Sequence, residues 1–217
     1  MKFRFPLLLL LFLSASLFGL NCAVLSSARD WPGSYCNTRN CCYPKSGKPP
    51  ADFSVRGFWG YYIDGTFPSH CDSATHFDPS TLRRKMERNW ATLACPSSTD
   101  FVIWKQQWMK HGTCSGLAPT KYFETAMKLK QRANLLGVLH NAGVTPGGTD
   151  YYSREAIREA ITRAIGYAPA LQCNLDKTGS PQLYEVYICV DSSASRFADC
   201  PGMPKQTCGE RIKIPLF

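Results

Sequence analysis

"ALQCNLDKTGSPQLYEVYICV", residues 170–190, holds two apolar runs separated by a turn-forming segment. The second run, LYEVYICV at 183–190, is rich in β-branched and aromatic residues, which favours a buried strand. The first run, ALQCNL, is placed to pair with it across DKTGSP. The stretch therefore predicts a β-hairpin at the centre of a sheet.

Helical patterns precede this hairpin. In SREAIREAITRAIG (153–166), Ser153 is suited to cap a helix and Gly166 to end it. The apolar stripe between them is Ile157, Ala160, Ile161, Ala164 and Ile165. A second helix is expected over 120–139, with Phe123, Ala126, Met127 and Leu135 on one face.

A third helix is expected around LRRKMER (82–88). Asp78 can cap it and Pro79 suits its first turn. Leu82, Met86 and Trp90 repeat at helical spacing, so the basic residues between them should form a solvated face. With 217 residues, no repeats and no linker, the chain is expected to be one α+β domain.

The N-terminus is typical of a secretory signal peptide. Lys2 and Arg4 precede an apolar run and small residues, and cleavage is expected at residue 23, with Ala28 as the alternative. This divides the chain into a signal at 1–23 and a domain at 24–217. The domain should enter the secretory pathway, for the extracellular space or a vacuole, and no later apolar stretch is long enough to hold it in a membrane.

The number of cysteines also indicates the secretory pathway. Apart from Cys22, ten remain, and an even number in a secreted chain predicts disulfides. Zinc is the rival for Cys36, Cys41 and Cys42, but no nearby histidine completes a ligand set. We therefore expect neither a metal nor a cofactor.

The chain is basic. Its formal charge of +9 becomes +7 without Lys2 and Arg4, because the signal carries no acidic residue. Such a charge attracts polyanions such as RNA, acidic polysaccharide or anionic membrane.

Several short motifs occur in a fixed order from Trp31 to the C-terminus. They are WPGSYC (31–36), CCYP (41–44), GFW before DGTFPSHC, NWATLACP (89–96), WKQQWMKHGTC (104–114) and AIGYAP…QCN…LYEVYICV. This ordered set closely resembles the ribonuclease T2 family, in particular its plant S-like branch. The resemblance implies an α+β, disulfide-rich domain with an antiparallel sheet and packed helices.

The resemblance also implies a reaction. Family members cleave RNA by attack of the ribose 2′-hydroxyl on the phosphate, which gives a 2′,3′-cyclic product and needs a base and an acid. The family's first motif, His-Gly-Leu-Trp-Pro, corresponds here to residues 56–60, with Arg56 in place of histidine and Trp59 retained. In the second motif, Gln106 and Gln107 replace histidine and glutamate, while Lys110 and His111 are retained.

These substitutions predict a degenerate catalytic site. Arginine stays protonated and glutamine does not titrate usefully, so the acid–base pair is incomplete. Loss of one proton-transfer partner typically costs roughly 10²–10⁴ in rate. On this reasoning the chain is not an enzyme but an inactive homologue.

The retained residues each admit two interpretations. His111 could be a packed residue or a working one, and Trp59 could pack or stack on a base. Arg56 and Lys110 could form a relict phosphate site, whereas Trp104 and Trp108 are expected in the core. Asp30 stands where family members carry glutamine beside a base pocket, and its negative charge should disfavour RNA.

The resemblance further implies a disulfide map that spacing alone does not determine. The pairs are Cys36–Cys41, Cys42–Cys95, Cys71–Cys114, Cys173–Cys208 and Cys189–Cys200.

Three functional hypotheses follow. The main one is a storage or stress-related protein, since the chain resembles catalytically silent ribonuclease-related vegetative storage proteins. The alternatives are a weakly active RNA endonuclease giving 2′,3′-cyclic phosphates, and a defence protein that binds RNA or phosphate. In each case we expect a monomer whose binding of RNA or nucleotides is weak and salt-dependent.

Overall fold

The computed structural model describes residues 24–62, 64–96, 100–201 and 204–217. The predicted signal at 1–23, with Lys2, Arg4 and Cys22, lies outside the described residues. The strands are β1 (Val24–Asp30), β2 (Ser54–Tyr61), β3 (Tyr151–Ser153), β4 (Ala170–Leu175), β5 (Pro181–Asp191), β6 (Phe197–Ala198) and β7 (Arg211–Lys213). The α-helices are α1 (Pro32–Thr38), α2 (Arg83–Asn89), α3 (Asp100–Lys110), α4 (Pro119–Ala133), α5 (Leu135–Asn141) and α6 (Arg154–Ile165), with short 3₁₀ turns at Pro79–Leu82 and Gly112–Cys114.

The strands form one sheet in the order β2-β1-β5-β7-β3, and β4 and β6 also pair with β5. The predicted hairpin is confirmed, because β4 and β5 pair antiparallel. The expected antiparallel sheet needs one correction: β5 and β7 run parallel, so the sheet is mixed. The first described strand, β1, lies between β2 and β5 along its whole length.

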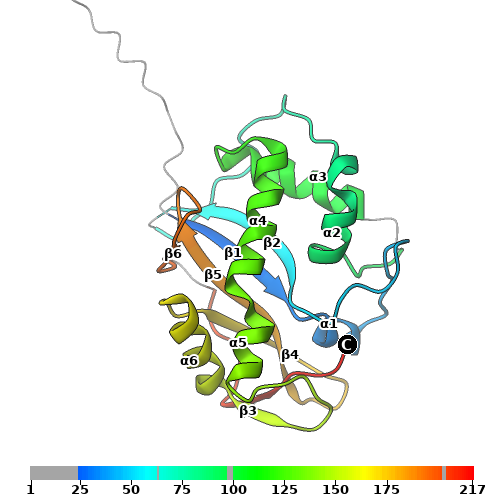
Figure 1. Cartoon of the computed structure of the whole chain (residues 1–217), viewed down its shortest axis with the longest axis vertical. Helices are drawn as coiled ribbons and strands as arrows, with labels where there is room; N and C mark the ends of the chain where they lie inside the picture. The colour runs from blue at the N-terminus through cyan, green and yellow to red at the C-terminus, as the bar shows by residue number, and fades with distance from the viewer. Residues whose placement is uncertain (1–23, 63, 97–99, 202–203) are drawn as a thin grey trace, which may run out of the picture.

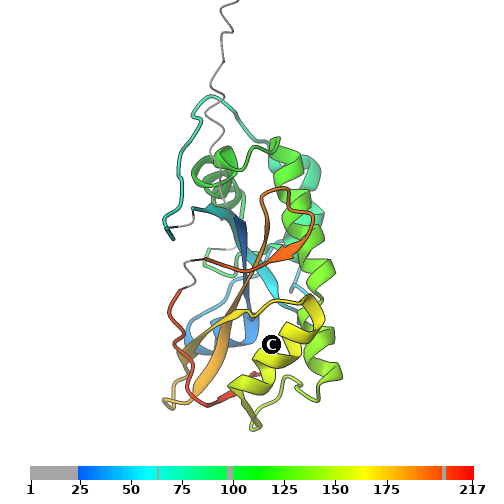
Figure 2. The ribbon, with the colours of Figure 1, turned by 90° about the vertical axis from the view of Figure 1, so that its left-hand side faces the viewer.

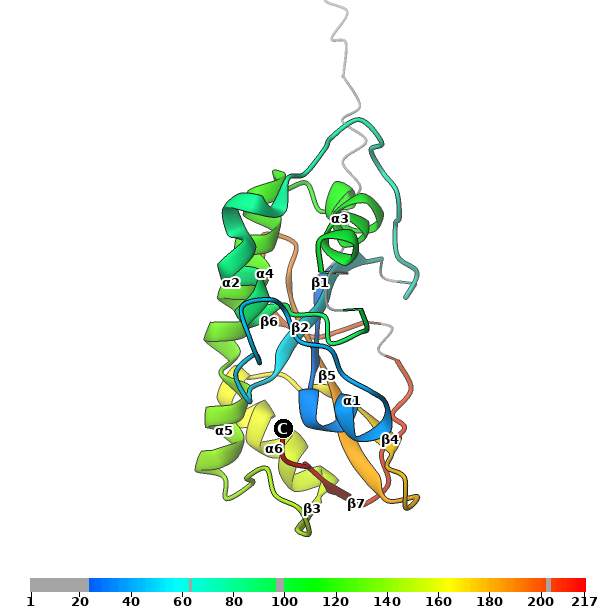
Figure 3. The ribbon, with the colours of Figure 1, turned by 90° about the vertical axis from the view of Figure 1, so that its right-hand side faces the viewer.

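Helices α4 and α5 run along one face of this sheet, and α3 lies beyond one end of it (Figure 1). Seen from either side, the helical layer and the sheet stand next to each other (Figures 2 and 3). One apolar cluster joins α5 and α6 to β4, β5 and β7. A second joins α2, α3 and α4 to β1 and β2, and it contains the buried Trp104 and Trp108, as predicted.

The helix predictions hold with two corrections. Ser153 caps α6 by accepting from the Ala156 amide, and Gly166 ends it at φ 84°, but Ala164 is exposed and is not part of the core stripe. The helix expected over 120–139 is two helices, because Asn134 adopts a left-handed conformation at φ 38° between α4 and α5. Asparagine tolerates this region better than most residues, so the break depends on backbone preference that apolar spacing does not reveal.

The basic segment LRRKMER behaves largely as expected. Asp78 caps the 3₁₀ turn that precedes α2 by accepting from the Ser80 amide. Leu82, Met86 and Trp90 are buried, and most basic residues of the segment are exposed. Arg83 differs, because it donates to the buried Glu87 carboxylate at 2.7 Å.

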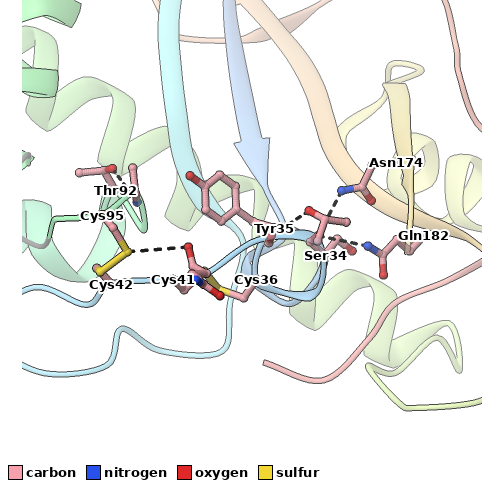
Figure 4. The surroundings of a disulfide bond; sticks show 12 residues. Ser34, Tyr35, Cys36, Cys41, Cys42, Thr92, Cys95, Asn174 and Gln182 are labelled. Atoms are coloured by element: carbon pink, nitrogen blue, oxygen red, sulfur yellow. Dashed lines mark hydrogen bonds between the residues drawn. A yellow bond between two sulfur atoms is a disulfide. The ribbon is translucent and has the colours of Figure 1, made fainter. Parts of the chain in front are cut away.

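The five disulfide pairs implied by the family resemblance are all present: Cys36–Cys41, Cys42–Cys95, Cys71–Cys114, Cys173–Cys208 and Cys189–Cys200. The first two lie beside α1 and the segment around Thr92 (Figure 4). No helix in the described part of the chain is long and apolar enough to cross a bilayer.

Candidate active site

The strand side of the site is built around Arg56 on β2. Its guanidinium contacts the Glu185 carboxylate, and its Nη1 lies 3.5 Å from the Tyr184 hydroxyl oxygen. Glu185 is buried, with 5% of its side chain exposed, and also accepts from the Tyr187 hydroxyl. The charge of Arg56 is therefore already compensated by the protein.

Asp30 adds a second carboxyl group to this cluster. It pairs with Glu185 in the β1–β5 register, and its Oδ1 lies 4.0 Å from Arg56 Nη1. That distance is too long for a hydrogen bond, and Oδ1 is buried without a partner among the described residues. Burial raises the pKa of Asp30 to about 7, and the positive charges of Arg56 and Arg39 offset this only in part.

The helix side of the site lies at the C-terminal end of α3. His111 directly follows α3, and its amide donates to the Gln107 carbonyl at 3.0 Å. The His111 side chain is buried, and its Nδ1 has no hydrogen-bond partner among the described residues. Burial, followed by the charges of Lys110 and His70, lowers the pKa of His111 to about 4. His111 is therefore a neutral imidazole at physiological pH.

The two glutamines take different positions on α3. Gln106 is exposed, whereas Gln107 is half-buried and turned toward β2. A Cβ at Gly57 would lie 3.3 Å from Gln107 Oε1 and would overlap the Trp59 ring. Glycine at this position therefore allows α3 to approach the strand that carries Arg56.

Aromatic side chains surround His111. The Trp59 ring centroid lies 5.5 Å from that of His111, and the Phe67 centroid lies 5.9 Å from it. Trp59 also meets Tyr187 edge-on at 6.2 Å. Trp59 thus packs within the site, and its predicted stacking on a base stays a prediction. Lys110 is exposed beside this cluster, with its Nζ 5.9 Å from the Phe67 ring centroid.

The residues that sequence reasoning missed are Tyr184, Glu185 and Tyr187. All three lie on β5, which was identified only as a buried strand. A signal was present, because a glutamate inside an apolar strand is rarely buried without a partner. Its partner, Arg56, lies 129 residues away in the sequence, so only the sheet register identifies the pair.

This arrangement can accept a proton at His111 and can hold negative charge near Lys110. It does not supply an acid at position 56, because arginine does not release a proton in the accessible pH range. The site therefore offers a proton acceptor at His111 and no proton donor at position 56.

Three curated relatives illustrate what the chain is similar to. Intracellular ribonuclease LX of Solanum lycopersicum is 49% identical over 87% of this chain and 82% of its own length. Ribonuclease 1 of Arabidopsis thaliana is 49% identical over 87% of this chain and 84% of its own length. A ribonuclease-like storage protein of Panax ginseng is 30% identical over 82% of this chain and 75% of its own length.

Solved structures agree with the fold. RNase NT in complex with 5′-AMP has a TM-score of 0.85 and 43% identity, and the match covers 89% of this chain and 98% of that one. A mutant of RNase MC1 in complex with 5′-GMP has a TM-score of 0.74 and 27% identity, covering 88% of this chain and 98% of that one.

These relatives correct the expectation that the chain is not an enzyme. Proteins that are 49% identical to it are named ribonucleases, whereas the storage protein is only 30% identical. The physical error was to equate a slower reaction with none. Loss of a proton-transfer partner lowers a rate by roughly 10²–10⁴ and leaves the remaining groups in place.

The family assignment follows from fold, motifs and sequence together. The mixed sheet, the five disulfides and the paired motifs at 56–60 and 104–114 form one arrangement. The model of the ribonuclease T2 family matches residues 22–200. The chain belongs to the ribonuclease T2 family, and its relatives place it with the plant S-like branch.

Proposed function

We propose that this protein is a weakly active RNA endonuclease that produces 2′,3′-cyclic phosphates. The observation that carries the proposal is the state of His111, which is buried, free of any ion pair in the described chain and neutral at physiological pH. A neutral imidazole beside an exposed lysine is what the first half of the reaction requires.

In this reaction His111 takes the proton of the ribose 2′-hydroxyl. The 2′-oxygen then forms a bond to phosphorus, and the bond from phosphorus to the 5′-oxygen breaks. Lys110 stabilises the negative charge that develops on the phosphorane oxygens. The departing 5′-oxygen takes its proton from water, because Arg56 cannot give one up.

The activity is expected to be weak because the site lacks a positioned acid. Solvent replaces a positioned proton donor, and such a donor typically contributes roughly 10²–10⁴ in rate. Gln106 and Gln107 bring no charge to the phosphorane, so electrostatic stabilisation is also reduced. We expect activity far below that of a family member with both histidines.

The proposed partner is RNA, bound weakly and in a salt-dependent manner by a monomer. The basic composition supports this, and so does the nucleotide bound in the similar RNase NT structure. Arg56 contributes less to such binding than its charge suggests, because Glu185 already pairs with it.

Digestion of RNA by the purified protein tests the proposal. His111→Ala should lower the rate by about 10²-fold or more, and His140→Ala, an exposed histidine on α5, should leave it unchanged. The products of the unmodified protein should carry 2′,3′-cyclic ends. If the unmodified protein makes no such products, or if His111→Ala digests equally well, the proposal is wrong.

A storage or stress role is a second candidate, and it does not depend on the rate of cleavage. The internal pairing of Arg56 with Glu185 favours it, because it removes a cation from the substrate site, and so does the similarity to the ginseng storage protein. The protein should then be abundant in a storage organ and should decline as the organ is consumed. Immunoblots through one growing season would measure this.

We also propose a location in the secretory pathway, in the extracellular space or a vacuole. All cysteines in the described ranges are paired, and such disulfides persist in oxidising compartments. Fusion of residues 1–23 to a fluorescent reporter tests it, because cytosolic retention would contradict the proposal.

A further inference from the structure

A groove of about 430 Å³ lies between α4 and the turn that joins β5 to β6. In Figure 2 this turn, drawn in orange, lies against α4. The described wall of the groove contains no acidic residue. Its cations are Lys121, Lys128 and Arg132, and its hydroxyl groups are those of Thr125, Ser193 and Ser195. The groove therefore presents only positive charge and hydroxyl groups as its polar surface, beside a few apolar side chains.

The three cations of the groove have no acidic partner. Within the described ranges of the chain, none of Lys121, Lys128 and Arg132 forms an ion pair. Arg132 lies instead over the Phe197 ring, 5.0 Å from its centroid. The acid of α4, Glu124, is exposed and lies outside the groove wall. The charge of the groove is therefore available to an external anion, in contrast to that of Arg56.

The nearest carboxylate on the other side of the groove is already engaged. Asp191 accepts from the Ser193 hydroxyl at 2.8 Å, and it forms an ion pair with Arg196 at 3.3 Å. It also accepts from the Ser195 amide at 2.8 Å. These bonds fold the turn so that its serines face α4, and they leave little of the carboxylate to neutralise the cations of the helix.

The spacing of the cations fits a chain of anionic groups. Lys121, Lys128 and Arg132 follow one another at helical intervals, so they share one face of α4. From Lys121 to Arg132 the helix rises about 16 Å, at about 1.5 Å per residue. One small anion cannot contact all three, whereas a polymer with repeated charges can. No aromatic ring lines the described wall, and single-stranded bases are usually held by stacking on such rings. The groove therefore suits a phosphate backbone and not the bases attached to it.

The groove begins near the helix side of the candidate site. Asp191 pairs with Val24, and Val24 pairs with Tyr61 on the next strand. Neighbouring strands lie about 4.8 Å apart, so the turn starts about 10 Å from Tyr61. The Tyr61 ring lies 6.3 Å from that of Trp59, which in turn lies 5.5 Å from that of His111. A single strand of RNA held at His111 can therefore continue around this end of the sheet into the groove.

We propose that this groove binds the phosphate backbone of the RNA substrate at a distance from the reacting phosphate. The inference deepens the proposed function and rests on it, because it takes RNA as the ligand. It gives the protein unpaired cations for RNA where Arg56 is neutralised by Glu185. A dinucleotide has one phosphate and cannot occupy both places. Long RNA should therefore bind more tightly than a dinucleotide, and with a steeper dependence on salt.

Binding of a single-stranded RNA of about 20 nucleotides tests the groove, with fluorescence anisotropy measured at several salt concentrations. Lys121→Ala, Lys128→Ala and Arg132→Ala together should lower the slope of log affinity against log salt by about 2, at about 0.7 per contact. At low salt the affinity should fall about tenfold or more. The matched control removes three exposed cations of α2 and thus the same charge. Its substitutions are Arg84→Ala, Lys85→Ala and Arg88→Ala, and the slope should change by less than about 0.7.

Cleavage rates provide a second measurement. The ratio of kcat/KM for the long RNA to kcat/KM for a dinucleotide should fall about tenfold or more in the groove variant, through KM, and should hold in the α2 variant. Thermal unfolding shows whether each variant is folded. If the triple variant does not fold, Lys128→Glu alone should shift both measurements in the same direction.

Equal losses in the groove and α2 variants would mean diffuse charge attraction and would overturn the inference. Unchanged binding of long RNA by the groove variant would overturn it as well. If that variant keeps RNA binding but loses binding to polygalacturonate, the occupant is an acidic polysaccharide and the assignment to RNA is wrong.

The outcome is separate from that of the proposed function. Loss of RNA binding in the groove variant of a protein that cleaves no RNA would support the groove alone. Cleavage that does not depend on the length of the RNA would support the endonuclease alone and would overturn the groove.

Discussion

The two halves of the candidate site come from different secondary structures, and they differ from the family motifs in different ways. The strand half consists of Asp30, Arg56 and Glu185, which lie on three neighbouring strands and form a charge cluster of their own. The helix half consists of Gln106, Gln107, Lys110 and His111 around the end of α3. Lys110 remains exposed there and His111 remains neutral. The comparison shows that the strand half pairs its charges internally, whereas the helix half keeps an exposed lysine beside a neutral histidine.

The largest expected effect is on the rate of RNA cleavage, when the residues of the family motifs are restored. Arg56→His, Gln106→His and Gln107→Glu together should raise RNA cleavage by roughly 10²–10⁴ over the unmodified protein. Initial rates against pH should then show a maximum between two pKa values.

The single variant Arg56→His is the control for this prediction. It should recover little activity, because the charged supporting groups at 106 and 107 are still missing. If Arg56→His alone restores the full rate, Gln106 and Gln107 do not limit cleavage, and the expected difference between the two halves is wrong.

Removal of one member of the strand cluster should lower stability. Arg56→Ala leaves the buried Glu185 without its cation, so we expect a loss of about 1–3 kcal/mol in the free energy of unfolding. Lys110→Ala on the helix half should change it by less than about 0.5 kcal/mol, because that side chain is exposed. Urea denaturation measures both.

Glu185→Gln in the Arg56→Ala background should recover most of the loss, because an amide is less costly to bury than an unpaired carboxylate. No recovery would mean that the ion pair is not what couples these two positions.

The two halves should also respond to pH in opposite directions. The pKa of Asp30 is raised to about 7 by burial, so its contribution to stability is present below about pH 4 and is lost as pH rises through 7. The pKa of His111 is lowered to about 4, so its contribution is present above about pH 6.5 and is lost as pH falls toward 4. Each effect should amount to about 1–3 kcal/mol over its window.

Differences between variant and unmodified protein separate these effects from other titrating groups. Relative to the unmodified protein, Asp30→Asn should gain stability as pH rises from 4 to 7. By the same measure, His111→Asn should lose stability from pH 4 to 6.5. Urea midpoints measured at several pH values would show this. For each variant, a plot of midpoint against pH that runs parallel to that of the unmodified protein would refute it.

The smallest expected effect concerns salt. Lys110→Ala should reduce the slope of log affinity for single-stranded RNA against log salt by about 0.7, the value for one phosphate contact. Arg56→Ala should reduce the slope by less, because Glu185 already neutralises it. A larger effect at Arg56 would restore the relict phosphate site in which Arg56 and Lys110 act together.

Local signals in the sequence identified much of the fold. The Ser153 cap, the Gly166 stop and the hairpin after it depend on neighbouring residues, so they could be predicted. The break at Asn134 could not be predicted, because a single left-handed residue leaves the apolar spacing almost unchanged. The family resemblance, and not the spacing of the cysteines, implied the disulfide pairs.

For the site, the sequence identified which residue types had changed but not what they contact. The sequence allows Arg56 to form a relict phosphate site with Lys110, yet Glu185 lies opposite Arg56 because β1 aligns β2 and β5. The neutrality of His111 likewise depends on burial, which a motif does not report. Contacts between distant segments determine both properties.

The central position of β1 has a consequence for biosynthesis. Val24 pairs with Asp191, so β1, the first strand of the described residues, must wait for a strand that is made more than 150 residues later. At typical ribosome speeds of 5–20 residues per second, this wait lasts roughly 10–30 s. During it one edge of β1 lacks its β5 neighbour, whereas the cysteines at 36, 41, 42, 71, 95 and 114 are already synthesised and can pair. The N-terminal disulfides can therefore organise the nascent chain before its sheet can close.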